Sequence, residues 1–170
     1  MIDAKVSKLL NEQVNKEFYS AYLYLHFANY FTEVGLAGFA NWYTVQAMEE
    51  RDHAMLFVKY MQHNGIPLQY EAIAKPEASL LSHRHVLLGG LQHEQFVTAS
   101  INAIYESAYV VRDFRTMQFL DWFVKEQGEE ETNAADLIKK LDLFGGDPKG
   151  LYMLDQELAG RVYGPPSLVL

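Results

Sequence analysis

The sequence predicts an all-α protein: a four-helix bundle with one long crossover connection and a short fifth helix near its C-terminal end. Two observations indicate this fold. Apolar side chains recur every three or four residues over four long stretches. A segment over 66–81 that contains Pro67 and Pro76 shows no sustained periodicity and separates the second stretch from the third. A connection of about fifteen residues can run the length of a bundle and start the next helix at the opposite end.

The first two helices are expected over 3–33 and 36–64. Asp3 is a suitable N-cap for the first helix, and Gly35 a suitable stop. Gly65 and Pro67 end the second helix. The short link at Gly35 predicts that the two helices form an antiparallel hairpin. The apolar stripe expected to face inward on the first helix is Leu10, Val14, Ala21, Leu25, Ala28 and Phe31.

The third helix is expected from Ser82, its N-cap, to about residue 111, and the fourth over 113–144. Gly89 and Gly90 weaken the start of the third helix, since each glycine costs up to about 1 kcal/mol relative to alanine. A Gly-Gly pair at 145–146 closes the fourth helix. The inward stripe of the fourth helix is predicted to contain Leu120, Phe123, Ala134, Leu137 and Leu141.

A short amphipathic segment, Leu151 to Leu158, follows Pro148 and Gly150. It is too short to be stable alone, so it must dock on the bundle or on neighbouring copies. With 170 residues, the chain is expected to form a single domain. We place the bundle at about 3–145, the fifth helix at about 150–160, and a tail without assigned structure at 161–170.

The composition of the chain excludes several classes of function. The chain has no cysteine, which leaves oxygen and imidazole nitrogen as the ligands for any metal. It starts without a basic and apolar leader and lacks an apolar run of membrane-spanning length, so we expect a soluble, cytoplasmic protein with no membrane partner. The net charge of −8 favours cations over nucleic acid, which we do not expect as a partner.

A polar residue interrupts each inward stripe near its middle. The interruptions are Glu17 on the first helix, Glu50 and His53 on the second, Glu94 on the third, and Gln127 and Glu130 on the fourth. A single inward glutamate is more often a hydrogen-bonded core acid, and a lone Glu-x-x-His match is weak. Four converging carboxylates would repel one another unless cations neutralised them. Two divalent ions would do so, and these donors suit iron or manganese better than copper.

These features resemble those of a non-haem bacterial ferritin, within the ferritin-like di-iron carboxylate family. The resemblance rests on Glu17, the quartet 50–53, Glu94 and the run 126–130, and extends from the first helix to about Leu158. It implies a shell of two dozen subunits that oxidises Fe(II) with dioxygen or peroxide and stores ferric mineral. By position, it implies that the first iron is held by Glu17, Glu50 and His53, and the second by Glu50, Glu94 and Glu130, with Gln127 beside them.

The resemblance also implies a third iron site, formed by Glu49, Glu126 and Glu129 and shared with Glu130. From the residues alone, the default interpretation of these acids is an ordinary solvated face, and the resemblance favours the site. Tyr24 lies two turns beyond Glu17, where its phenol can hydrogen-bond a ligand, supply an electron, or simply pack in the core. Trp122 is interpreted as core, and the other histidines, namely His26, His63, His83, His85 and His93, as surface or structural residues.

Sister families differ at informative positions. Rubrerythrins and bacterioferritins would be expected to have a second Glu-x-x-His on the fourth helix, where this chain has Glu130 in place of the histidine. Asp52 stands where a haem-ligating methionine would be expected, so no haem is predicted. The small DNA-protecting relatives build their iron site between subunits and lack a fifth helix. Two alternatives remain: a di-iron oxidase or peroxidase of the rubrerythrin type, and a non-catalytic helical interaction module with a buried polar network.

Overall fold

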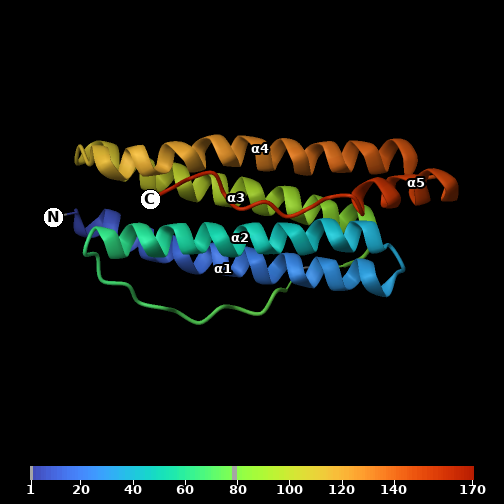
Figure 1. Ribbon diagram of the computed structural model, residues 1–170, viewed down its shortest axis with the longest axis horizontal. Helices are drawn as coiled ribbons and strands as arrows, with labels where there is room; N and C mark the ends of the chain where they lie inside the picture. The colour runs from blue at the N-terminus through green and yellow to red at the C-terminus, as the bar shows by residue number, and fades with distance from the viewer. Residues whose placement is uncertain (1, 78–79) are drawn as a thin grey trace.

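The computed structural model describes residues 2–77 and 80–170. These residues contain five helices (Figure 1). They are α1 (Ala4–Glu33), α2 (Ala37–His63), α3 (His83–Val110), α4 (Phe114–Phe144) and α5 (Pro148–Leu158). Helices α1 to α4 lie side by side along one long axis, and α5 packs across the end of the bundle against α2 and α4. The predicted fold class, including the crossover and the fifth helix, is confirmed.

The helix ends follow the predicted capping chemistry. The side chain of Asp3 accepts hydrogen bonds from the first turn of α1, and Ser82 does the same for α3. Gly35 and Gly65 adopt φ values of +80° and +64°, which favour glycine, just after α1 and α2. Only α5 departs noticeably from expectation: it begins at Pro148, because the Asp147 carboxylate caps it by accepting from the Gly150 amide.

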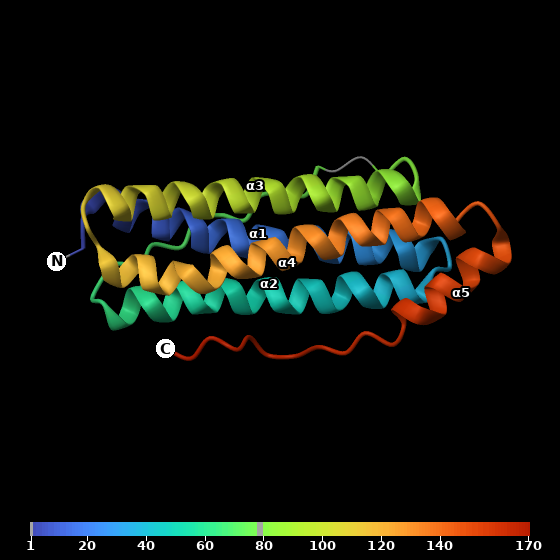
Figure 2. The same cartoon turned by 90° about the horizontal axis from the view of Figure 1, so that it is seen from above.

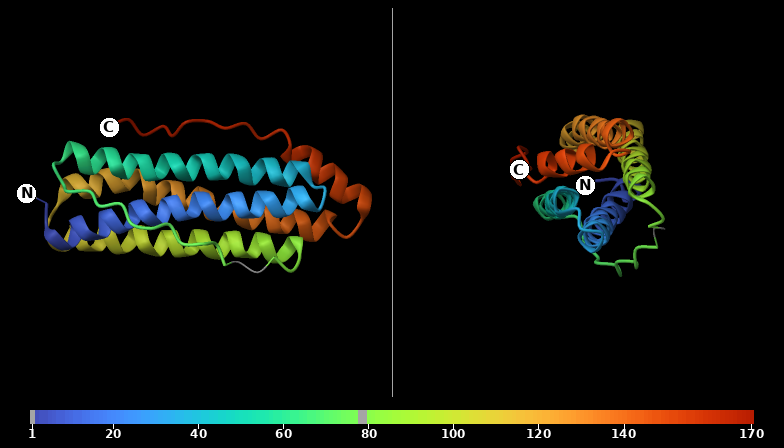
Figure 3. Two further views of the ribbon diagram at one scale, coloured as in Figure 1. Left: turned by 90° about the horizontal axis from the view of Figure 1, so that it is seen from below. Right: turned by 90° about the vertical axis from the view of Figure 1, so that its right-hand side faces the viewer.

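The crossover between α2 and α3 runs along α1 (Figure 3). Two asparagines of α1 hold it there. The side chain of Asn11 exchanges hydrogen bonds of 3.0 and 2.8 Å with the backbone of Gln69, and Asn15 donates to the carbonyl of Ala72. The predicted crossover also includes residues 78–79, which lie outside the described residues.

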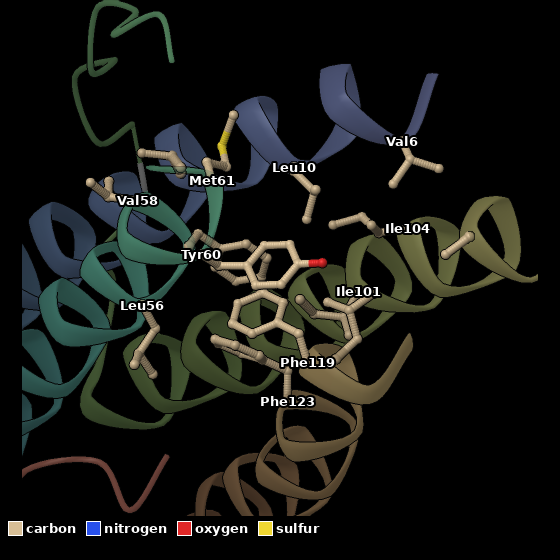
Figure 4. Packing of buried hydrophobic residues seen from close by; sticks show 14 of the residues in the cluster. Val6, Leu10, Leu56, Val58, Tyr60, Met61, Ile101, Ile104, Phe119 and Phe123 are labelled. Atoms are coloured by element: carbon tan, nitrogen blue, oxygen red, sulfur yellow. The ribbon is translucent and has the colours of Figure 1, made fainter. Parts of the chain in front are cut away.

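The hydrophobic core consists of two clusters, one toward each end of the bundle. One cluster includes Leu10, Ile101, Phe119 and Phe123 (Figure 4), and the other surrounds Phe31 and includes residues of α5. Burial agrees with most of the predicted stripes. The prediction for Leu25 is wrong, however, because Leu23, Tyr24 and Phe27 take the inward face of α1 and leave Leu25 49% exposed.

Helix α5 docks on the bundle because one of its side chains caps the N-terminus of α2. Leu36, the N-cap of α2, makes no side-chain capping bond, and the buried carboxylate of Asp155 accepts from the amides of Gly38 and Phe39 instead, at 2.8 and 3.0 Å. Gly38 is needed for this approach, since a Cβ at that position would lie 1.6 Å from the carbonyl oxygen of Asp155. The docking therefore depends on a residue without a side chain.

The last ten residues, 161–170, run back along α2 as an extended segment (Figure 2), which we call the C-terminal strap. Ser167 accepts a 3.0 Å hydrogen bond from the indole of Trp122, and Leu168 packs against the first hydrophobic cluster. The sequence pattern predicted no structure for this segment. Within the described residues, no helix is both long and apolar enough to cross a membrane.

Candidate metal centre

Buried polar side chains gather between the two hydrophobic clusters, and six of them were predicted from interrupted apolar stripes. Each bundle helix contributes at least one: Glu17 from α1, Glu50 and His53 from α2, Glu94 from α3, Gln127 and Glu130 from α4. Their exposed fractions are all 5% or less. Because 50 and 53 are one helical turn apart, the carboxylate and the imidazole project from the same face of α2.

The side chains converge into two groups that share one residue. Glu17, Glu50 and His53 each offer a ligand atom within 4.8 Å of the others, and so do Glu50, Glu94 and Glu130. These two sets of three match the two iron sites that the sequence resemblance implies. Glu50 belongs to both groups, which is the arrangement that a carboxylate bridging two neighbouring metal ions requires.

Two glutamines orient these carboxylates. The Gln13 amide donates a 2.8 Å hydrogen bond to Glu17, and the Gln46 amide donates to both Glu50 and Glu130, at 3.0 and 2.7 Å. Neither glutamine was predicted to have a role. A signal was present, since each glutamine stands four residues before an inward glutamate, the spacing of neighbours on a helix face.

On α3, Glu94 accepts hydrogen bonds from two sides. The phenol of Tyr24 donates to its Oε1, and the amide of Gln127 donates to its Oε2 at 3.1 Å. Tyr24 therefore contacts a candidate ligand, in line with the first of the roles considered for it. Trp122 packs edge-on against the ring of His53, with ring centroids 5.5 Å apart, so this indole borders the cluster.

The ionisable side chains of the cluster shift one another's pKa values. Burial and the negative charge of Glu50 raise the pKa values of Glu17 and Glu130 to about 8, and burial, Glu50 and Glu130 raise the pKa of Glu94 well above its usual range. Burial would also raise the pKa of Glu50, but the charge and hydrogen bond of His53 outweigh it and lower the value. For His53, burial lowers the pKa, but the charge and hydrogen bond of Glu50, together with the charges of Glu17 and Glu130, outweigh burial and raise the pKa to about 10.

The donor set fits hard or borderline metal cations such as iron. Glu17 Oε2 is buried and has no hydrogen-bond partner among the described residues, an uncommon and costly state for a carboxylate oxygen. Cations bound between the two groups would give this oxygen a partner and cancel the mutual repulsion of the four carboxylates. Oxygen donors with a single imidazole suit iron or manganese.

The residues predicted for a third site do not form a compact group like the two described above. Glu49, Glu126 and Glu129 are not among the groups whose ligand atoms lie within 4.8 Å of one another in the described part of the chain. Glu49 pairs with Arg161 of the C-terminal strap at 2.5 Å, and Glu129 pairs with Lys125 at 3.4 Å. Burial raises the pKa of both Glu49 and Glu126. The third site stays a prediction, and the tail contact was missed because sequence analysis left 161–170 unassigned.

Comparison with known proteins relates both the sequence and the structure to one family. The model of the "Ferritin-like domain" matches residues 7–144. A bacterial non-heme ferritin from Campylobacter jejuni is 37% identical over 156 residues, covering 92% of this chain and 93% of that protein. Another, from Staphylococcus haemolyticus, is 34% identical and covers 96% of this chain and 98% of that protein.

Solved structures give the same result. The open pore ferritin of the hyperthermophilic archaeon Archaeoglobus fulgidus superposes with a TM-score of 0.92 at 41% identity, over 95% of this chain and 98% of that one. A form of that ferritin engineered to be closed gives a TM-score of 0.93 at 40% identity, over 96% of this chain and all of that one.

Proposed function

The chain belongs to the ferritin family, and from this premise we infer that it stores iron and oxidises Fe(II) at its buried carboxylate cluster. The observation that carries the inference is that two groups of potential ligands share Glu50 at the centre of the bundle. One electron leaves each of two Fe(II) ions, and dioxygen or peroxide takes up the pair. The ferric product then hydrolyses to mineral in an enclosed cavity.

The protein residues act as ligands of the iron ions and as hydrogen-bond donors that position those ligands. We propose Glu17, Glu50 and His53 as ligands of the first iron ion and Glu50, Glu94 and Glu130 as ligands of the second. Their largely anionic donor set favours Fe(III) over Fe(II), and so promotes oxidation of the bound ion. The amides of Gln13 and Gln46 hold the carboxylates in place, and Tyr24 fixes Glu94 by a hydrogen bond.

Storage needs an enclosed volume that one bundle lacks. Ferritins are cage-forming oligomers, and we propose that this chain forms a shell of two dozen subunits, as the sequence resemblance implies. We also propose that the shell works in the cytoplasm. The exposed apolar side chains Tyr22 and Leu25 on α1, and Tyr70 and Ile73 on the crossover, support contacts between copies.

A small cavity adjoins the cluster and argues against an oxidase that acts on an organic substrate. It is lined by Tyr24, Gln46, Glu94 and Glu130, among others, and holds about 10 Å³. A volume of that size accommodates about one water molecule. Dioxygen or peroxide is of the right scale to enter after small side-chain movements, whereas an organic substrate is far too large.

Oxygen consumption after anaerobic loading with Fe(II) tests the function. The unmodified protein should take up dioxygen rapidly, and Glu50→Ala or His53→Ala should slow uptake by more than about 100-fold, since even loss of an outer partner of a metal ligand costs about 10–100-fold. His63→Ala is the matched control, because His63 is exposed on the same helix. Wild-type uptake rates in the Glu50 and His53 variants would overturn the proposal.

A further inference from the structure

Arg161, at the start of the C-terminal strap, is held in place from several sides. Its guanidinium donates to the carboxylate of Glu49 at 2.5 Å, to the amide oxygen of Gln46 at 2.9 Å and to the carbonyl of Trp42 at 3.2 Å. It also lies 4.4 Å from the centroid of a Trp42 ring. Such a guanidinium is a permanent positive charge in a preorganised position.

The arginine stands next to the proposed iron centre. Gln46 accepts from Arg161 through its Oε1 and donates through its Nε2 to Glu50 and Glu130, so a single amide links the guanidinium to the shared carboxylate. The Arg161 and Glu49 side chains are only 21% and 20% exposed, which limits the screening of their attraction by solvent. Glu49 is therefore held by a cation that the chain itself provides.

The other two acids near Glu49 are less constrained. Glu129 is 59% exposed and pairs with a lysine that is 79% exposed, a contact of little energetic weight. Glu126 is half-buried and has no ion pair within the described residues. Both side chains can turn toward a cation, whereas Glu49 must first leave Arg161.

We propose that Arg161 stands in for a metal ion at Glu49, so that a third ion binds beside the di-iron centre only when the C-terminal strap is displaced. The inference rests on the proposed function, since it concerns the step by which iron leaves the central pair. Arg161 is a positioning residue here. It makes the passage of iron toward Glu49 depend on the conformation of the chain end.

The strap has further anchors that keep Arg161 in place. Asn41 donates to the carbonyl of Arg161 at 3.0 Å, the phenol of Tyr163 donates to Asp52, and the indole of Trp122 donates to Ser167 at 3.0 Å. All these contacts are made with α2 or α4, the two helices that carry the predicted third site. The strap is thus fixed at several points along its length by hydrogen bonds that involve side chains.

Titration calorimetry of the full-length, metal-free protein with Zn(II), which does not change oxidation state, tests this role. The unmodified protein should bind two ions tightly in each subunit. Arg161→Gln should bind a third ion about tenfold or more tightly than the unmodified protein does. The double variant with Glu49→Gln should return to two ions, since it lacks the carboxylate that Arg161 had held.

Two further variants make the result decisive. Ending the chain after Gly160 removes the arginine together with the strap and should also open the third site. Arg84→Gln is the matched control, because Arg84 pairs with Asp142 on the surface and, among the described residues, neither side chain hydrogen-bonds the strap, so the count should stay at two. Circular dichroism checks that each variant is folded.

The outcomes separate the two proposals. Equal third-site affinity in the unmodified protein and in both Arg161-lacking variants would overturn the role of Arg161, as would a third ion that survives Glu49→Gln. Failure of the proposed function would look different: the two central ions would be missing from every variant, and Glu50→Ala would change nothing.

Discussion

Glu50 differs from the other glutamates of the cluster because it lies within 3.2 Å of the His53 imidazole. In the metal-free protein, this neighbour keeps Glu50 ionised and itself carries a proton, since the pKa of Glu50 is lowered and that of His53 is raised to about 10. Glu17, Glu94 and Glu130 have raised pKa values and are mostly protonated at neutral pH. Before metal binds, the centre should therefore be close to neutral in charge.

Metal binding should consequently release protons. At pH 6.5, two divalent ions should displace about four protons from each subunit, one each from Glu17, Glu94, Glu130 and His53. Near pH 9 the number should be lower, because Glu17 and Glu130, with pKa values of about 8, are then already ionised. A pH-stat measurement with Zn(II) checks this count. A count near zero at pH 6.5 would contradict the charge state deduced for the centre before metal binds.

The sequence was sufficient to predict those side chains of the centre that interrupt an apolar helix face. Each inward position is set by helical periodicity, and a charged residue at such a position is conspicuous. Arg161 lies on no helix, so periodicity does not report on it. Its pairing with Glu49 arises from the way the chain end folds back along α2, which depends on long-range contacts that local sequence does not encode.

At the scale of elements, α5 is attached to the bundle at the start of α2. The Gly38 Cα and the backbone of Asp155 are in close contact, and the Asp155 carboxylate caps α2. The capping of α2 by Asp155 could not be predicted from the sequence. Leu36, which precedes α2, has no side-chain acceptor, and Asp155 lies more than a hundred residues further along the chain. The capping residues Asp3, Ser82 and Asp113 were predictable, since each immediately precedes its helix.

Gly38→Ala should therefore displace α5. The added Cβ would lie 1.6 Å from a carbonyl oxygen, and overpacking of this kind costs about 2 kcal/mol, or about 4–8 °C in Tm for a chain of this size. Gly128→Ala is the control, because Gly128 lies in α4 with nothing within 4 Å of the added Cβ, and alanine favours the helix. Thermal unfolding measures both variants. A Tm of Gly38→Ala at or above that of the unmodified protein would refute the docking role.

At the scale of the whole molecule, the exposed apolar side chains on α1 and the crossover should face another copy. Light scattering should find a particle of about 470 kDa, or two dozen chains of 19.5 kDa. Leu25→Glu should produce smaller species, because it places a charge where the 49% exposed leucine would be covered. Thr132→Glu, on an exposed position of α4, adds the same charge as a control. A stable monomer or dimer of the unmodified protein would refute the shell.

The central claim is that the cluster holds two iron ions that share Glu50. Anomalous diffraction from crystals loaded with Fe(II) without oxygen tests it most directly. We expect two iron peaks in each subunit, about 3.5–4 Å apart, one among Glu17, Glu50 and His53 and the other among Glu50, Glu94 and Glu130. A single peak, or iron found only at surface carboxylates, would contradict the account.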